Sequence, residues 1–262
     1  MTALGDLTWP EAERRAAAGA LLAVPVGSTE QHGPHLPLST DTDIAVALAT
    51  RLAARRGDVI VAPAVCYGSS GEHAGFAGTI SVGQEAVELV LVELGRSATA
   101  TFGKVLFVSA HGGNAEPARR ATARLRAESR DVLLWPSGPV PAAPGRPPDA
   151  HAGRFETSLT LALDPGRVRR GEAAAGNVTP LATLLPALRA GGVRAVSPNG
   201  VLGDPAGASA AEGAATLARL EAGLAAAVAA WLGGPCGQGA GSGEAADVPD
   251  TYRTADRDGT GR

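Results

Sequence analysis

Short apolar segments alternate along this chain with longer segments of helical periodicity, and this alternation limits the folds that the chain can adopt. Mostly apolar runs predict strands at 20–26, 59–62, 104–109 and 132–135. Apolar residues spaced three or four apart predict helices at 44–54, 85–102, 114–128, 153–163 and 208–232. Strands that are apolar on both faces are typical of parallel sheets covered by helices. The pattern therefore predicts an α/β layered fold with a mostly parallel sheet.

The predicted elements fill one domain rather than two. The chain has 262 residues, of which 45% are hydrophobic, and this is enough to build a sizeable core. No linker or internal repeat divides residues 1–233, so we expect a single catalytic domain there. Proline is dense at 136–148, which predicts a loop. Residues 234–262 are rich in Gly, Asp, Ser and Thr, and we expect a disordered tail because they have little apolar surface to bury.

Composition argues against several classes of function. The formal net charge is −3, so there is no basic excess to neutralise a nucleic-acid backbone. The N-terminus lacks the features of a signal peptide, and no uncharged apolar run is long enough to span a membrane. The chain has only two cysteines, Cys66 and Cys236, which argues against a disulfide framework and suits a reducing compartment. We therefore expect a cytoplasmic protein that binds neither nucleic acid nor a membrane.

Polar motifs follow the predicted strands at the points where a parallel sheet places its ligands. In open α/β sheets, ligands bind at the carboxyl ends of the strands. Two of these ends lie just after Val26 and just after Ser109, and histidines follow both. All five histidines of the chain stand in loops or at element boundaries, beside glycine or another polar residue. One such histidine is ordinarily a packing or capping residue, but five together favour a site.

The first motif runs from Gly27 to Asp43. Glu30 and His32 are two residues apart, so their side chains share one face of an extended segment. Carboxylate and imidazole together suit zinc, iron or manganese. The Gly-Pro turn that follows allows the loop to return Asp41 toward this face. The alternative is structural: Asp41 caps the next helix, and Glu30 pairs with an arginine.

The second motif, His111-Gly112-Gly113-Asn114, follows the strand at 104–109. A histidine at the carboxyl end of a strand is a good position for a metal ligand. The two glycines allow close approach of a ligand or supply backbone amides to a developing anion. Alternatively, Asn114 is only the cap of the following helix.

The third motif places His151 at the mouth of the helix predicted at 153–163, with Glu156 one turn inside it. A histidine there can transfer protons, and the glutamate can complete a metal shell. The alternative is a helix capped by Asp149 with Glu156 paired to an arginine.

Two further segments and several absences complete the survey of motifs. Residues 67–81 contain His73 among glycines and small hydroxyls, which predicts a loop that lines a substrate pocket. Residues 197–205 contain two tandem turn signals and are interpreted as a structural turn. The chain has no dinucleotide or Walker fingerprint, so nucleotide cofactors lack support. It also lacks the Gly-x-Ser-x-Gly motif of serine hydrolases.

Taken together, these motifs resemble the creatininase (creatinine amidohydrolase) superfamily over roughly residues 7–232. The most specific match is Glu30-Gln-His32-Gly-Pro-His35-Leu-Pro, followed by Asp41. The resemblance continues in order through the segments 71–73, 79–81, 111–114, 151–158 and 199–205. It implies a three-layer α/β/α sandwich that holds one or two divalent ions.

The resemblance also implies roles for individual residues. The family's metal ligands fall on Glu30, His32, Asp41 and His111, and Asp41 is the bridging carboxylate. His151 matches the family's proton-transferring histidine.

One glutamate of the family pattern is missing from this chain. Creatininase has histidine, an aromatic residue, glutamate and asparagine in its second motif, whereas this chain has two glycines between His111 and Asn114. Glu156 then completes the shell of the second ion and takes part in catalysis, or that ion is weaker or missing. The loss of the aromatic residue argues against creatinine as substrate. His73, Gly112, Gly113 and Asn114 are left as the candidate substrate contacts.

Within the superfamily, the details are most similar to the branch that matures mycofactocin. This similarity implies an Fe²⁺- or Zn²⁺-dependent peptidase that removes a C-terminal Val-Tyr dipeptide from a modified precursor peptide. It also implies a homo-oligomer. One alternative is an amidohydrolase or deformylase that acts on a small cyclic or formylated amine. Another is a non-catalytic scaffold that binds a modified peptide.

Overall fold

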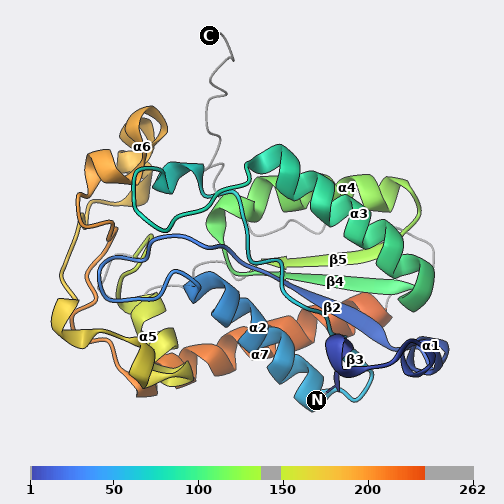
Figure 1. Cartoon of the computed structure of the whole chain (residues 1–262). Coiled ribbons are helices and arrows are strands. Elements are labelled where there is room, and N and C mark those ends of the chain that lie inside the picture. Colours follow the sequence, from blue (N-terminus) through green and yellow to red (C-terminus); the bar gives the residue numbers. More distant parts are fainter. Residues whose placement is uncertain (1, 137–148, 234–262) are drawn as a thin grey trace, which may run out of the picture.

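Five strands form one sheet in the order β1-β3-β2-β4-β5, and every neighbouring pair is parallel (Figure 1). The computed structural model describes residues 2–136 and 149–233. The strands in chain order are β1 (Thr2–Ala3), β2 (Leu21–Val26), β3 (Val59–Val61), β4 (Lys104–Ser109) and β5 (Asp131–Pro136). The predicted parallel sheet is confirmed, and the long pair β2–β4 forms its centre.

Helices cover both faces of this sheet, so the domain has three layers (Figure 1). On one face, α2 (Thr40–Arg55), α5 (Arg154–Leu163) and α7 (Ala210–Gly233) pack together. On the other face lie α3 (Gln84–Phe102) and α4 (Ala115–Ala127). The two remaining helices are α1 (Trp9–Ala17) and α6 (Leu181–Val196).

Each face of the sheet has its own hydrophobic core because side chains alternate along a strand. In β2, Leu21 and Ala23 pack toward α2 and α7, whereas Leu22 and Val24 pack toward α3 and α4. The other strands divide in the same way. Burial of both faces explains why these strands are apolar throughout.

The sequence pattern located most of these elements to within a few residues, but three were not predicted. Strand β1 has only two residues. Helix α1 has nine residues, and none of them is buried. Helix α6 contains Pro186, and Gly192 has non-helical φ 71° and ψ −175° inside it. The proline-dense loop, apart from Pro136 at the end of β5, and the C-terminal tail lie outside the described residues.

Helix α7 is long and apolar enough to cross a membrane by length and composition alone. In this structure it is a core helix of the domain. Its Leu217 and Leu224 lie in the cluster beneath the sheet. Its buried Glu221 pairs with Arg51 and Arg55 of α2.

The strand order reverses beside β2, which makes the carboxyl ends of β2 and β4 the expected place for a ligand site. From β2 the chain crosses to β3 on one side, and β4 then returns to the other side of β2. Such a reversal of strand order opens a ligand site at the carboxyl edge of the sheet. The loops that follow β2 and β4 carry the first two predicted motifs to this place.

Candidate metal centre

The loop after β2 carries Glu30 and His32 into the interior. Its ends are tied together, since the backbone N–H of Glu30 donates to the carbonyl of Leu38 (3.0 Å). His32 and Leu36 form an isolated antiparallel bridge across the turn. Both predicted ligands are buried, with exposures of 1% for Glu30 and 0% for His32.

Asp41 faces this loop rather than serving as a helix cap. Helix α2 begins at Thr40 with Ser39 as its N-cap, so Asp41 lies in the first turn. Its Oδ2 accepts a hydrogen bond from Ser28 Oγ (2.7 Å) and lies 3.1 Å from His111 Nδ1, while its Oδ1 lies 3.2 Å from His32 Nε2. Burial opposes ionisation, but the two imidazoles hold the pKa of Asp41 well below its usual range.

His111 joins the cluster from the end of β4. Its Nδ1 faces Asp41, while its Nε2 lies 3.3 Å from Glu30 Oε2 and 2.8 Å from the carbonyl oxygen of Ser69. Burial disfavours the charged imidazole, yet Glu30 and Asp41 raise the pKa of His111 well above its usual value. The sheet thus brings the first and second motifs together.

Glu156 reaches the same cluster from the first turn of α5. Its Oε2 accepts a hydrogen bond from the backbone N–H of Ala152 (2.5 Å) and lies 3.9 Å from His32 Nε2. Burial raises the pKa of this carboxyl. Asp149 makes the capping contact, since its Oδ2 accepts from the backbone N–H of Phe155 (3.1 Å). Asp149 thus makes the capping contact of the structural alternative. Glu156, in contrast, is directed at His32 rather than paired with an arginine among the described residues.

His151 lies between two other histidines of the cluster. Its ring centroid is 4.3 Å from those of both His32 and His73. Two backbone hydrogen bonds with Leu202 fix the chain at His151. The next residue, Ala152, is buried at a φ of 53°, a strained conformation for a residue with a side chain. The segment interpreted as a structural turn therefore supports a residue of the site.

The hydrogen bonds of His151 define its tautomer. His151 Nε2 lies 2.7 Å from the backbone carbonyl oxygen of Gln31, which can only accept, and 3.0 Å from the side-chain Nε2 of Gln31, which can only donate; the shorter contact assigns the proton to His151 Nε2. The free lone pair is then on Nδ1, which lies 3.8 Å from Glu30 Oε1. Burial, reinforced by His32 and His73, lowers the pKa of His151 well below its usual value. The ring is therefore a neutral base directed into the cluster.

Gln31 is a site residue that the sequence pattern did not single out. Its side-chain Nε2 contacts His73 Nδ1 (2.8 Å) and the carbonyl of Gly200 (3.0 Å). Because Gln31 Nε2 donates to His73 Nδ1, the proton of the neutral His73 ring is on Nε2. That nitrogen lies 3.4 Å from Glu30 Oε1. An amide suggests no chemistry by itself, so its place between Glu30 and His32 was the only available signal.

The four candidate substrate contacts do not share one environment. His73 is buried against Glu30, as described above. Asn114 is buried and uses its amide to join loops, because its Oδ1 accepts from Ser69 N–H and its Nδ2 donates to the carbonyl of Gly27. Gly113 is buried beside His111, whereas Gly112 is exposed.

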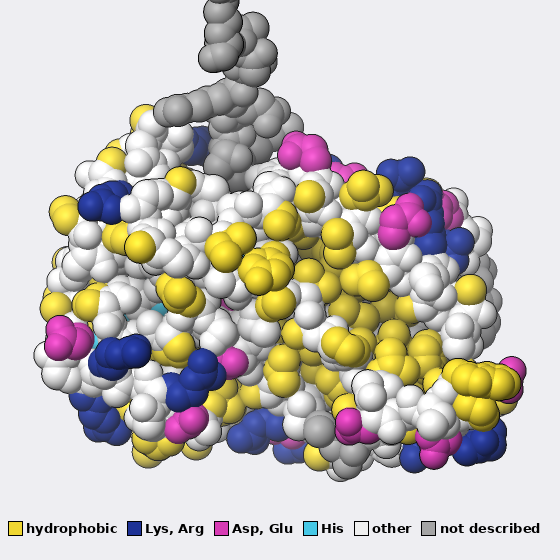
Figure 2. All heavy atoms as spheres, in the orientation of Figure 1, with side chains coloured by type: hydrophobic (Ala, Val, Ile, Leu, Met, Phe, Trp, Pro, Cys, Tyr) yellow, Lys and Arg dark blue, Asp and Glu magenta, His cyan; other side chains and the backbone are white. Residues whose placement is uncertain are grey.

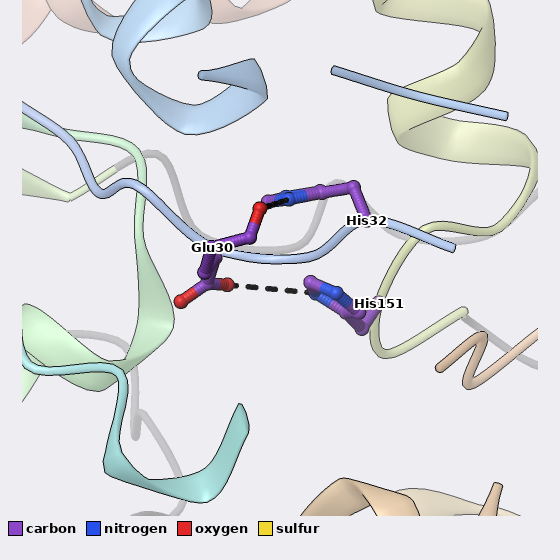
Figure 3. A group of neighbouring side chains, drawn as sticks. All are labelled: Glu30, His32 and His151. Atoms are coloured by element: carbon purple, nitrogen blue, oxygen red, sulfur yellow. Dashed lines mark hydrogen bonds and ion pairs between the residues drawn. The ribbon is translucent and has the colours of Figure 1, made fainter. Parts of the chain in front are cut away.

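Three overlapping sets of these side chains have ligand atoms within 4.8 Å of one another. They are Glu30 with His32 and His151, Glu30 with Asp41 and His111, and His32 with Asp41 and Glu156. Figure 3 shows the first set, with the Glu30 carboxylate directed at the His151 ring. Glu30 Oε2 is buried and has no hydrogen-bond partner, as expected of an oxygen built to meet a cation.

The protonation of this cluster reflects the crowding of its charges. Burial and the nearby Asp41 carboxylate raise the pKa of Glu30 to about 8, although His111 opposes the shift. Burial lowers the pKa of His32, but Asp41 outweighs it and raises the value to about 10. Carboxylate oxygens and imidazole nitrogens at these separations form a donor set for a divalent transition metal.

Comparisons with known proteins agree with this geometry. The chain matches the family described as creatinine amidohydrolase over residues 5–228. It is 50% identical over 216 residues to the mycofactocin precursor peptide peptidase of Mycolicibacterium smegmatis, an alignment that covers 80% of this chain and 85% of the relative.

Solved structures show the same similarity. A crystal structure of creatininase superposes with a TM-score of 0.75 at 25% identity, covering 89% of this chain and 99% of the other. A creatininase variant described as the Zn–Zn type superposes with a TM-score of 0.70 at 26% identity, covering 86% of this chain and 96% of the other. Both the sequence and the fold lead to one conclusion: this chain belongs to the creatininase family.

Proposed function

We propose that this chain is a metal-dependent peptidase that shortens the mycofactocin precursor peptide, and that it releases a C-terminal Val-Tyr dipeptide. One observation carries the proposal: three carboxylates and the imidazoles of three histidines converge in a buried cluster at the end of β2 and β4. Removing such charges from water is costly unless a cation compensates for them. The similarity to mycofactocin precursor peptide peptidases supports the choice of substrate.

The residues present fit two neighbouring cations. Glu30, Asp41 and His111 would hold one, and His32, Asp41 and Glu156 the other. Asp41 is placed to bridge them, since its two oxygens face different histidines. The His32 ring fits this role because its Nδ1 contacts the carbonyl of Glu30 (3.2 Å) and leaves Nε2 for the cation. Fe²⁺ and Zn²⁺ both suit this donor set.

When bound, such ions act as Lewis acids on water and on the amide carbonyl. The chain supplies the proton transfer. His151 Nδ1 accepts a proton from the attacking water as the carbon–oxygen bond forms. It then delivers this proton to the leaving nitrogen as the amide carbon–nitrogen bond breaks, a step of the kind that contributes about 10²–10⁴-fold to the rate. Backbone amides near Gly112 and Gly113 are candidates to stabilise the developing oxyanion.

The proposed enzyme acts in the cytoplasm as a homo-oligomer. Figure 2 shows hydrophobic side chains gathered on one face, in the region between α3 and α1 of Figure 1. These two helices carry exposed large hydrophobic residues, namely Leu89, Val90 and Leu94 of α3 and Trp9 of α1. Apolar surface of this kind favours contact with another protein chain.

The test incubates the Zn²⁺- or Fe²⁺-loaded protein with the modified precursor peptide and follows the products by mass spectrometry. We expect a shortened peptide and a free Val-Tyr dipeptide. A chelator should abolish the reaction, and Glu85→Gln, which alters an exposed carboxylate of α3, should leave it unchanged. Cleavage of a small cyclic or formylated amine in place of the peptide would instead support an amidohydrolase. Peptide binding without turnover would support a scaffold.

A further inference from the structure

A fourth carboxylate lies beside the candidate metal centre, outside the three ligand sets. Glu72 belongs to the short helix η2 (Gly71–His73), next to His73. Its Oε1 atom is buried and has no hydrogen-bond partner among residues 2–136 and 149–233. Burial raises the pKa of Glu72, and His111 counteracts that shift. A buried carboxylate oxygen without a partner costs free energy, so its retention calls for an explanation.

The position of this oxygen is defined by a glycine. A Cβ atom added at Gly113 would lie 2.7 Å from Glu72 Oε1, 2.5 Å from His111 Nε2 and 2.1 Å from the carbonyl oxygen of Ser69. These three atoms therefore surround one small space, and any larger residue at position 113 would fill it. The Glu72 carboxylate and the His111 imidazole both border the space that Gly113 leaves open, and no hydrogen bond joins them in the described part of the chain.

A second glycine fixes the backbone of Glu72 from the other side. Helix α6 packs against η2, and a Cβ at Gly192 would lie 2.7 Å from the carbonyl oxygen of Glu72. Gly192 has a φ of 71°, which is the kink inside α6. The side chain and the backbone of Glu72 are thus each held by a close approach that glycine permits. These two close approaches indicate that the fold holds the Glu72 carboxylate in one position.

The surroundings of His111 Nε2 show what the carboxylate does. That nitrogen lies 2.8 Å from the Ser69 carbonyl and 3.3 Å from Glu30 Oε2, so the Glu72 carboxylate adds further negative charge on the same side of the ring. Metal-bound histidines ordinarily direct their second ring nitrogen at a carbonyl or carboxylate, which orients the ring and increases its basicity.

We propose that Glu72 supports the metal centre from outside the ligand sets: its carboxylate borders the space at Gly113 beside His111 and adds negative charge that stabilises a bound cation. This inference rests on the proposed metal-dependent function. It gives residues 67–81, which are predicted to line a substrate pocket, a part in the metal centre as well. This chain has Gly113 where the creatininase pattern has a glutamate. Glu72, from a different loop, would supply a carboxylate beside that position.

The test compares Glu72→Gln, which keeps the shape and removes the charge, with the control Glu85→Gln. Zn²⁺ affinity is measured by competition with a chelating dye, and the Co²⁺-loaded proteins are compared by visible absorption. We expect Glu72→Gln to raise the Kd for Zn²⁺ by about 10–100-fold and to alter the cobalt spectrum. Glu72→Asp, which keeps the charge, should recover much of the affinity. The control should match the parent chain.

The thermal transition of the metal-free variants separates this role from a structural one. Glu72→Gln should melt at the same temperature as the parent or higher, because a buried unpaired charge is removed. If Glu72→Gln folds and binds Zn²⁺ and Co²⁺ as the parent does, Glu72 has no part in the metal centre and the inference is wrong. If Glu72→Gln does not fold, Glu72→Asp decides. A Kd for Zn²⁺ close to that of the parent supports a role for the negative charge, and a Kd raised by about 10–100-fold contradicts it. If the parent chain itself binds neither ion, the proposed function fails and this inference fails with it.

Discussion

Metal loading should depend steeply on pH, because the cluster holds protons where a cation would bind. In the metal-free chain, the pKa of Glu30 is raised to about 8 and that of His32 to about 10, while the pKa of His111 lies well above its usual value. All three groups therefore carry protons near neutral pH. A divalent cation accepts only the carboxylate and the neutral imidazole, so these protons must leave as it binds.

The size of the effect follows from the number of protons. Loss of up to about three protons lowers the apparent Kd for Zn²⁺ by up to about 10³-fold per pH unit, which corresponds to about 4 kcal/mol. Affinity rises with pH because deprotonation favours the ligand form of each group. Above pH 8, Glu30 has already lost its proton, so the slope should decrease by about one proton.

Titration calorimetry measures this release directly. Zn²⁺ is added to the metal-free protein in several buffers of different ionisation enthalpy, between about pH 6 and pH 8. The variation of the observed heat with buffer gives the number of protons released, and chelator competition at each pH gives the Kd. Release of less than one proton together with a Kd that does not change with pH would refute the protonation pattern and the assignment of these groups as ligands.

Three further predictions concern single substitutions. Glu30→Ala or His32→Ala should abolish peptide cleavage while circular dichroism stays that of the parent; a metal-free variant that still cleaves would contradict the proposed mechanism. His151→Gln should lower kcat by about 10²–10⁴-fold with little change in Zn²⁺ affinity, since its role is proton transfer; an unchanged kcat would exclude that role. Gly113→Ala should destabilise the fold by about 1–3 kcal/mol in urea unfolding, because its Cβ would lie 2.1 Å from the Ser69 carbonyl oxygen; unchanged stability would show that the loop adapts freely.

The sequence pattern predicted the sheet well because burial on both faces leaves a strong signal. The strand at Lys104–Ser109 was predicted with its observed bounds, and β2 differs by one residue. Helix α1 has no buried residue. The sequence signal for this helix is at its N-terminus, where Thr8 and Glu11 form a capping box. Helix α6 was concealed by Pro186 and its glycine pair, which are typical helix breakers, and the helix is indeed interrupted at Gly192, whose φ and ψ are not helical.

The site was predictable where a residue's chemistry and its place after a strand coincide. Glu30 and His111 follow β2 and β4, and parallel strands bring both to one edge of the sheet. Gln31 carries no such signal, since its role comes from contacts with His73 and Gly200, residues far away in the sequence. Glu72 is similar, because only the folded chain shows the space left by Gly113.

The cost of this cluster in the metal-free chain explains why its supports are spread over so many elements. Within the described residues, Glu30 Oε2 and Glu72 Oε1 are buried without a hydrogen-bond partner, although His111 Nε2 lies 3.3 Å from the former, and Ala152 is held in a strained conformation. Each feature destabilises the metal-free fold, so the surrounding layers must supply the compensating free energy. A cation that binds only the folded chain adds stability as its concentration exceeds the Kd, by about 2.7 kcal/mol at 100-fold excess. In the proposed enzyme, the acidic groups that destabilise the metal-free chain would favour a bound cation, so that stability and activity would depend on one cluster.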